Sequence, residues 1–318
     1  MKLSKEETQI FCEVITGGPD ATQETLSQLV APESAYNFRV NGKSIGRHST
    51  ENINIVPKPD GQGLDIYIAP NTKHETVHIP VAISVTGHKE TVYNDFHIGE
   101  NAEVIIIAGC GIYNCGGVDS VHDGIHRFDV GKGAHITYIE KHYGFGQGRG
   151  GKILNPTTEV HLKEGAIAHL ELEQIKGVDS TIRNTVAKLE QNAKLTVKER
   201  LMTHGRQTAE SSYDIRLEGK DSTADLESRS IAQDYSTQTF KSTITAIAKS
   251  RGHSACDAII MDQAKVFALP ALNAEIKDAE LIHEAAIGKL ASDQITKLMT
   301  LGLTQAQAES HIINGFLK

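Results

Sequence analysis

The stretch NAEVIIIAG at residues 101–109 places a turn residue and an alanine in front of a run of β-branched residues. Comparable stretches recur at separations of 32, 32, 27 and 29 residues, as GAHI from 133, GAIA from 165, NAKL from 192 and DSTAD from 221. Glycine and asparagine suit a tight corner with positive φ, and the alanine is small enough to turn inward. A recurring unit made of strands and corners indicates a solenoid.

Strand-like runs fill the chain between these corners, from about residue 35 to residue 268. Apolar and polar residues alternate in DIYIA (65–69), HITYIE (135–140) and KLTVKERL (194–201), as they do in half-buried strands. Propeller repeats are longer and carry Trp-Asp pairs, whereas this chain has no tryptophan. We therefore predict a parallel β-helix with about two coils in each repeat. We expect the helical N-terminus to cover one of its ends.

The first 34 residues form a separate N-terminal helical segment in this interpretation. LSKEETQIFCEVIT (3–16) is amphipathic, and Ser4 with Glu7 three residues later fits a capping box. Gly17 and the residues after it end this helix. Asp20 is a suitable cap for a second short helix that reaches about Leu29.

The β-helix core is assigned to residues 35–272, and residues 273–318 are assigned to a C-terminal helical segment. Three short helices are expected there, in LIHEAAIGKL (281–290), SDQITKLMTLGL (292–303) and TQAQAESHIINGFL (304–317). Ser292 and Thr304 are good N-caps for the second and third helices.

Composition limits the classes of function. The net charge of the 318 residues is −8 and no block of five Lys or Arg occurs, which disfavours nucleic-acid binding. No apolar run approaches the roughly 18 residues of a membrane-spanning helix, so we expect no membrane insertion. The first residues, MKLSKEETQIF, lack the apolar region of a signal peptide, so we expect a cytoplasmic protein. Its four cysteines are then expected to be reduced. Because the sequence contains no CxxC pair, we expect no structural zinc site.

Two glycine-containing stretches resemble nucleotide motifs only in part. NGKSIGRHS (41–49) contains Gly-Lys-Ser, but a P-loop needs glycine where Asn37 stands. GFGQGRGGK (144–152) contains GxGxxG, but a loop and a strand follow it, whereas a dinucleotide site requires a helix. We expect no ATP site in the first stretch and an ordinary connection between coils in the second.

Two cysteines and two histidines within 17 residues form a weak candidate metal site. Cys110 and Cys115 lie in GCGIYNCGG, and His122 and His126 lie in VHDGIHRFDV. Histidines four apart chelate zinc when they lie on a helix, but Gly124 and its neighbours read as a strand. A structural role for these residues is the favoured alternative.

A third constellation combines HSACDAIIM (253–261) with the stretch from residue 281. Cys256 lies in the first, and His283 and Glu284 are adjacent in the second. A buried cysteine in a strand is usually inert. Thiolate, imidazole and carboxylate are nevertheless suitable iron ligands, and such a mixed set holds a cluster less permanently than four thiolates do.

The sequence resembles the SufB/SufD family, the scaffold proteins of the Suf iron–sulfur cluster assembly system. The resemblance rests on HSACDAIIMDQAKVFALPAL and LIHEAAIGKLASDQITKLMTLGLTQAQAESHIINGF, and upstream on DGIHRFDVGKGA, EKHYGFG, ILNPTTEVHL, QIKGVDST, ERLMTHG and DLESRSIAQD. It covers the chain from about residue 35. The chain is shorter than typical bacterial SufB and resembles the compact, standalone members.

The resemblance implies a right-handed parallel β-helix between N- and C-terminal helices, and dimers formed through the β-helix. It implies C-terminal helices that bind SufC, an ABC-type ATPase, so ATP hydrolysis is expected in the partner and no catalysis in this chain. Further expected partners are a sulfur donor and apo-proteins that accept the cluster. The cluster is expected to be transient; its type and the involvement of a flavin stay open.

Motif matching also implies roles for single residues. Cys256 in ACDAII aligns with a SufB cysteine implicated in nascent cluster assembly, and Glu284 in HEAAIGK aligns with a glutamate implicated with it. His283 lies near the position of an important SufD histidine. Cys110 and Cys115 match no motif securely. The alternative function is a cluster-free adaptor for the ATPase, whereas a polysaccharide-cleaving β-helix enzyme is disfavoured because aromatics are few.

Overall fold

The computed structural model describes residues 3–16, 34–290 and 292–317. Within these residues about 60% of the chain is strand, and three short helices flank the strands. The elements in chain order are α1 (Lys5–Thr16), β1 (Ala35–Val40), β2 (Lys43–His48), β3 (Ile53–Pro57), β4 (Gly63–Ile68), β5 (Lys73–Ile83), β6 (Lys89–Ile98), β7 (Glu103–Tyr113), β8 (Ser120–Val130), β9 (His135–Phe145), β10 (Lys152–Leu154), β11 (Thr157–Leu162), β12 (Ile167–Lys176), β13 (Ser180–Leu189), β14 (Lys194–Thr203), β15 (Thr208–Leu217), β16 (Thr223–Ala232), β17 (Thr237–Ala246), β18 (Arg251–Ile260), β19 (Lys265–Ala274), β20 (Glu280–Lys289), α3 (Ser292–Thr300) and α4 (Gln305–Phe316).

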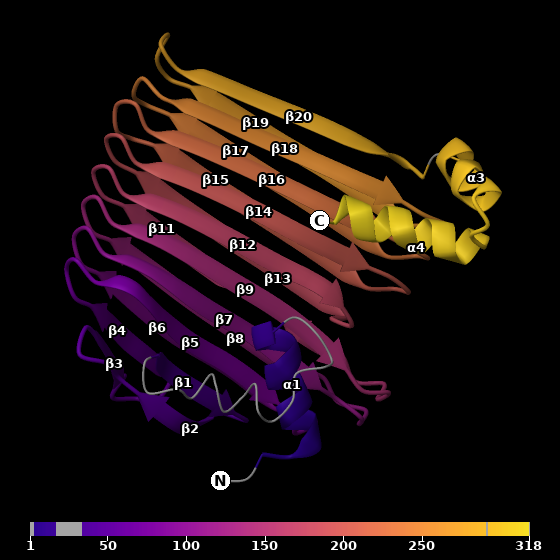
Figure 1. Cartoon of the computed structure of the whole chain (residues 1–318), viewed down its shortest axis with the longest axis horizontal. Coiled ribbons are helices and arrows are strands. Elements are labelled where there is room, and N and C mark those ends of the chain that lie inside the picture. The colour runs from indigo at the N-terminus through magenta and orange to yellow at the C-terminus, as the bar shows by residue number, and fades with distance from the viewer. Residues whose placement is uncertain (1–2, 17–33, 291, 318) are drawn as a thin grey trace.

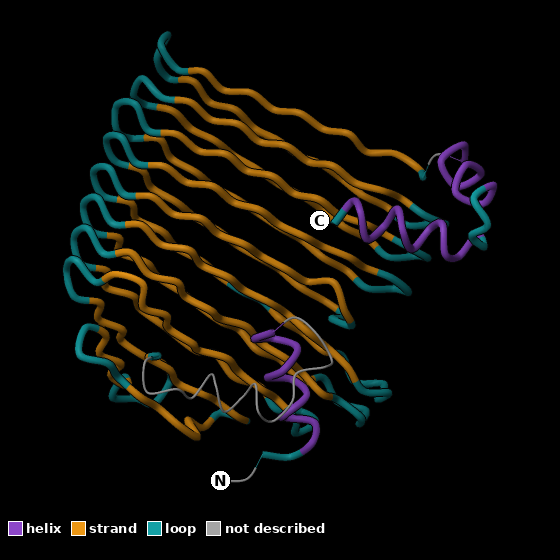
Figure 2. The backbone as a smooth tube through the Cα atoms, viewed as in Figure 1, coloured by secondary structure: helices purple, strands orange, loops and turns teal. Residues whose placement is uncertain are grey.

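The strands form a parallel β-solenoid of about eight turns, which confirms the predicted architecture (Figure 1). One sheet, here sheet A, has the order β2-β1-β5-β7-β9-β12-β14-β16-β18-β20. The facing sheet, sheet B, has the order β19-β17-β15-β13-β10-β8-β6-β4-β3, with β11 between β13 and β8. The chain alternates between the two sheets, so strands that are one coil apart in sequence are hydrogen-bonded neighbours. Figure 2 shows the strands stacked side by side along the solenoid.

The turn residues singled out in the sequence occupy corners of the solenoid. Asn101 and Asn192 have φ of 55° and 59°, and Gly133 and Gly165 have 65° and 69°. These values lie in the left-handed region, which favours glycine and asparagine. The corners stack through backbone hydrogen bonds, such as that from the Gly133 N–H to the Glu164 carbonyl at 3.0 Å.

Each sequence repeat supplies one coil, not the two coils that we expected. Cys110 on β7 pairs in register with His142 on β9, which is one repeat further along the chain. A coil therefore consists of one strand in each sheet. Strands of ten or eleven residues are longer than the short alternating runs suggested, because a ladder bonded on both sides stabilises residues with little strand propensity of their own.

The side chains that point inward fill the space between the sheets. In β8 and β9 every second residue is buried, and the buried positions of adjacent coils stack in columns. Val104 and Ile136, neighbours in one column, are 3% and 0% exposed. Burial of each such side chain contributes about 1.5–3 kcal/mol. Several of the inward positions carry polar side chains instead, and these form the site described below.

The N-terminal helix is confirmed, but its placement differs from the expectation. Glu7 N–H donates to Ser4 Oγ at 3.1 Å and Ser4 N–H donates to Glu7 Oε2 at 2.8 Å, which is the capping box. The helix packs across β5, β7 and β9 on the outer face of sheet A and does not cover the solenoid end. That end finishes in antiparallel pairs, β1 with β2 and β3 with β4. The second helix, expected at 20–29, lies outside the described residues.

The first of the three predicted C-terminal helices is wrong. Residues 281–290 fall almost entirely in β20, which pairs in parallel with β18 along its whole length, from Glu280 beside Arg251 to Lys289 beside Ile260. The backbone of β18 needs hydrogen-bond partners on this side, and tertiary pairing overrides the helical pattern. Strands of the solenoid therefore continue past residue 272.

The other two C-terminal helices are confirmed as α3 and α4, which pack on each other. Thr304 caps α4, and its hydroxyl accepts from the Gln307 N–H in a full capping box. No helix in the described part of the chain is long and apolar enough to cross a membrane.

The two glycine-containing stretches are connections. Gly42 and Lys43 lie at the hairpin between β1 and β2, with no helix after them. Residues 146–151 join β9 to β10 and are likewise followed by a strand.

Candidate functional site

Cys256 lies on the inner face of sheet A near the C-terminal end of the solenoid. The alternating burial of β18 turns it inward, where it is 1% exposed and belongs to the main core cluster. Its neighbours in register are Ser228 on β16 and Ala285 on β20. Burial raises the pKa of Cys256 to about 12, and the carboxylates of Glu199 and Asp257 act in the same direction. Cys256 is therefore a neutral thiol in this structure.

The structure separates the two other residues of that constellation. His283 pairs in register with Ser254, a buried residue on the face of sheet A that carries Cys256. Its Nδ1 is buried and has no hydrogen-bond partner. Glu284 pairs with Ala255 and points to the outer face, where its side chain is 72% exposed. Its Oε2 lies 3.9 Å from Nε2 of His253. Cys256 and His283 thus lie on the same face of sheet A, with His283 partly buried, and Glu284 lies on the opposite face.

A second cysteine, Cys110, lies inside the solenoid among imidazoles. It is 5% exposed on the inner face of sheet A, and its sulfur contacts His122 from sheet B and His142 from the next strand of sheet A. Burial alone would raise the pKa of Cys110, but these two imidazoles lower it below its usual value. Burial alone would lower the pKa of His122, but Cys110 and Glu90 raise it to about 10. Each group of this thiol–imidazole pair therefore favours the charged form of the other.

The other members of the weak metal candidate do not join Cys110 and His122. His126 is buried between Phe96 and Tyr138, and burial lowers its pKa to about 4, so it is neutral. Cys115 is exposed in the loop after β7. Within residues 3–16, 34–290 and 292–317 no group of three His, Cys, Asp or Glu is placed to hold a metal ion.

Charged side chains also line the interior between the two cysteines. Arg183 contacts the carboxylate of Glu140, and its Nε lies 3.7 Å from Oε1 of Glu199. Ser228 donates to Oε2 of Glu199 at 2.7 Å, next to Cys256 in register. All of these side chains are at most 4% exposed.

Sequence reasoning missed this interior set. The alternation of inward and outward residues along the strand could have revealed it. In HITYIEKH, Glu140 and His142 fall on the same face as the apolar Ile136 and Tyr138. An inward charge is costly unless it is paired, and the partner, Arg183, comes from another strand 43 residues away. The pairing is therefore visible only in the fold.

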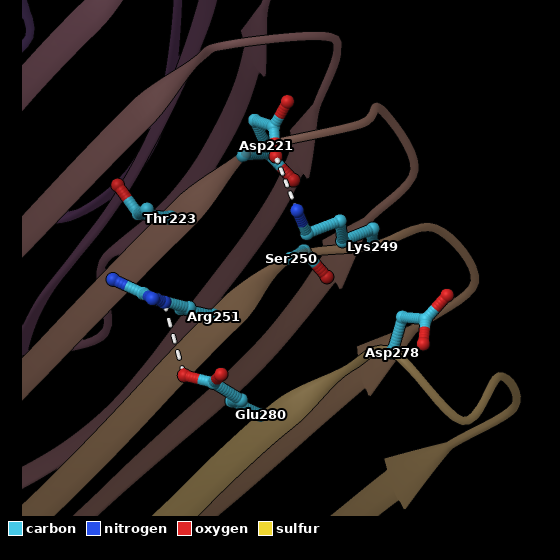
Figure 3. Close-up of a pocket in the computed structure, with 8 residues that line it drawn as sticks. Asp221, Thr223, Lys249, Ser250, Arg251, Asp278 and Glu280 are labelled. Atoms are coloured by element: carbon cyan, nitrogen blue, oxygen red, sulfur yellow. Dashed lines mark ion pairs between the residues drawn. The ribbon is translucent and has the colours of Figure 1, made fainter.

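A groove of about 260 Å³ lies at the corners before β16, β18 and β20. Figure 3 shows its charged side chains, with Arg251 Nε 3.0 Å from Glu280 Oε2 and Lys249 Nζ 3.8 Å from Asp221 Oδ1. These residues are successive corner positions, and their ion pairs are largely exposed. Cys256 lies five residues beyond Arg251, on the inner face. The groove is separate from the interior site.

Comparison with known proteins gives one family. Residues 86–316 match the family model described as "SUF system FeS cluster assembly, SufBD core domain". A Methanothermobacter thermautotrophicus protein named "Iron-sulfur cluster assembly SufBD family protein" is 27% identical over 236 residues, covering 72% of this chain and 55% of that protein. Similarly named proteins of Methanocaldococcus jannaschii and Pyrococcus horikoshii are both 26% identical, over 76% and 86% of this chain and 76% and 84% of their own lengths. The chain spans about half the length of the first relative.

Proposed function

We propose, from the premise that this chain belongs to the SufBD family of iron–sulfur cluster assembly proteins, that it is a scaffold on which a nascent cluster is built. The observation that carries the proposal is the pair of interior cysteines. Cys110 and Cys256 lie on the same inner face, the first with a lowered thiol pKa and the second with a thiol pKa raised to about 12. A scaffold for iron and sulfide needs both a nucleophile for sulfur and a ligand for iron.

Cys110 is the better nucleophile for sulfur in this arrangement. Its thiolate attacks the outer sulfur of a persulfide carried by a donor protein, the S–S bond breaks, and the donor leaves as a thiolate. Cys110 then carries the persulfide. His122 and His142 remain beside it to stabilise negative charge on sulfur.

Cys256 and His283 are the proposed interior ligands for iron. A thiolate and a neutral imidazole suit iron, and the buried Nδ1 of His283 lacks a partner that a metal would supply. Because the Cys256 thiol is neutral when no cation is present, iron binding must release its proton. The cluster is cargo that the scaffold passes to acceptor apo-proteins.

Glu284 enters the ligand set only if β20 moves. It now points away from Cys256, but β20 is the edge strand of sheet A and is bonded only to β18. An edge strand with one neighbour rearranges at lower cost than a central strand. We propose that the ATPase partner drives this change by binding one arrangement of the C-terminal end better than the other.

The proposed partners fit exposed surfaces at the same end. Apolar side chains are exposed along the two edge strands β19 and β20, namely Phe267, Leu269, Leu272, Ile282 and Ile287. Unpaired edges of this kind are templates for pairing with another strand, and we assign them to a second copy of this chain. Helices α3 and α4, with Met299 44% and Leu301 80% exposed, are assigned to a SufC-like ABC ATPase. We place the assembly in the cytoplasm.

Anaerobic reconstitution with iron and a sulfide source tests the proposal. Protein-bound iron and acid-labile sulfide are measured in wild type, Cys256→Ser and Glu284→Ala, with the exposed Cys115→Ser as the matched control. Loss in Cys256→Ser with retention in Cys115→Ser supports the scaffold. Equal cluster in wild type and Cys256→Ser rejects Cys256 as a ligand. No cluster in any variant, even with the ATPase and ATP, favours the alternative of a cluster-free adaptor.

A further inference from the structure

Cys110 and His122 face each other across the solenoid interior, one from each sheet. Both are almost fully buried, at 5% and 3% exposed, and the sulfur contacts the imidazole. An imidazole activates a thiol only when its ring is held in one orientation and its charge is stabilised. The residues that contact His122 on the side away from Cys110 decide whether its ring is held and its charge is stabilised.

Glu90 lies directly behind His122. It pairs in register with His122 in sheet B, and its Oε1 lies 3.0 Å from the Nδ1 of that histidine. The other ring nitrogen therefore remains for Cys110. Burial alone would raise the pKa of Glu90, but His122 and Arg39 lower it to about 2, so it is ionised. This order of thiol, imidazole and carboxylate is the arrangement that generates nucleophilic thiolates.

Arg39 anchors the far oxygen of Glu90. Its Nε donates to Oε2 at 2.9 Å, and the two side chains are 12% and 6% exposed. Arg39 belongs to β1, where it pairs in register with Val81, the neighbour of Cys110. The match to the family model begins at residue 86, so this anchor comes from outside the matched region.

We propose that Glu90 and Arg39 are positioning residues that hold His122 as the imidazolium partner of a Cys110 thiolate. The N-terminal strand β1 thereby controls the reactivity of a cysteine two strands away in sheet A. The chemical use of the thiolate rests on the proposed function, but its existence does not.

The other titratable groups next to Cys110 and Glu90 favour negative charge on both. His88 Nε2 lies 3.7 Å from Oε2 of Glu90 on the side away from His122. His142, the second contact of Cys110, lies 3.6 Å from Oε1 of Glu140, 3.4 Å from Gln174 and 3.5 Å from Arg183. Burial alone would lower the pKa of His142, but Glu140 and Cys110 raise it.

Titration of thiolate ultraviolet absorbance tests the proposal. The absorbance due to Cys110 is the difference in absorbance between each protein and the same protein carrying the additional substitution Cys110→Ser. It is recorded from acidic to mildly alkaline pH. In wild type the thiolate should form below the usual thiol pKa of about 8.5. Glu90→Gln keeps the shape but removes the charge, and it should reduce the thiolate at neutral pH about tenfold, equivalent to one pKa unit. Arg39→Met should act in the same direction with a smaller effect.

Glu159→Gln is the matched control. Glu159 Oε2 lies 3.1 Å from Arg127 Nε on the outer surface, so this substitution should leave the titration of Cys110 unchanged. Circular dichroism verifies folding, and Arg39→Met serves if Glu90→Gln does not fold. A wild-type step at the usual thiol pKa, or an unchanged step in both variants, overturns the proposal. The titration uses protein without iron or sulfide, so failed reconstitution beside a normal titration rejects the proposed function alone.

Discussion

Replacing Arg183 with methionine should destabilise the solenoid strongly at neutral pH and much less in acid. Arg183 is 4% exposed and lies between two buried carboxylates, Glu140 at 1% and Glu199 at 4%. Removing one partner of a buried ion pair costs about 3–5 kcal/mol, because the remaining charge is left uncompensated. Burial alone would raise the pKa of Glu140, but Arg183 and its neighbours hold it well below its usual range.

The sign of the pH dependence follows from that lowered pKa. Glu140 contributes stability above its unfolded-state pKa of about 4.3, and the contribution is lost as pH falls through the folded value. Without Arg183 the pKa of Glu140 rises, and protonation then relieves the unpaired charge. The difference in unfolding free energy between wild type and Arg183→Met should therefore shrink between neutral pH and about pH 5.

Urea unfolding followed by circular dichroism at several pH values measures this difference. Arg216→Met is the control, because Arg216 is 41% exposed and its pair with Glu218 is worth about 0–1 kcal/mol. The reasoning is refuted if Arg183→Met costs no more than the control. It is also refuted if the cost increases as the solution is acidified.

Three further predictions concern the thiol, the edge and the helix. Apparent iron affinity should increase about tenfold for each unit by which the pH is raised, because Cys256 loses one proton when it binds iron. Competition with a chelator measures this affinity, and an affinity that does not change with pH would exclude the Cys256 thiol as a ligand. Leu269→Glu on the exposed edge should convert dimers to monomers in sedimentation velocity, and persistent dimers would place the interface elsewhere. Gly111→Val should destabilise the docking of α1 by about 1–3 kcal/mol, since an added Cβ would lie 2.3 Å from Ile10; faster alkylation of buried Cys12 reports it, and unchanged alkylation contradicts it.

The sequence by itself determined the architecture, because corner chemistry is local. Asn101, Gly133 and the residues like them favour positive φ whatever surrounds them, so their spacing revealed the repeat, although the number of coils in each repeat was predicted wrongly. The capping box of α1 and the N-cap Thr304 of α4 were predicted for the same reason. Cys256 was singled out by its neighbours in sequence, and its inward position followed from strand alternation.

Only the tertiary structure decided what the interior residues meet. The stretch from residue 281 has a helical pattern but becomes β20, because the open edge of β18 supplies the hydrogen bonds. That register turns His283 inward and Glu284 outward, so adjacent residues face opposite sides of one sheet. The lowered pKa of Cys110 depends on His122, and Glu90 and Arg39 follow behind that histidine, so three other strands bring this set to the thiol. Charge pairing across a core depends on distance in space, and spacing along the chain does not fix that distance.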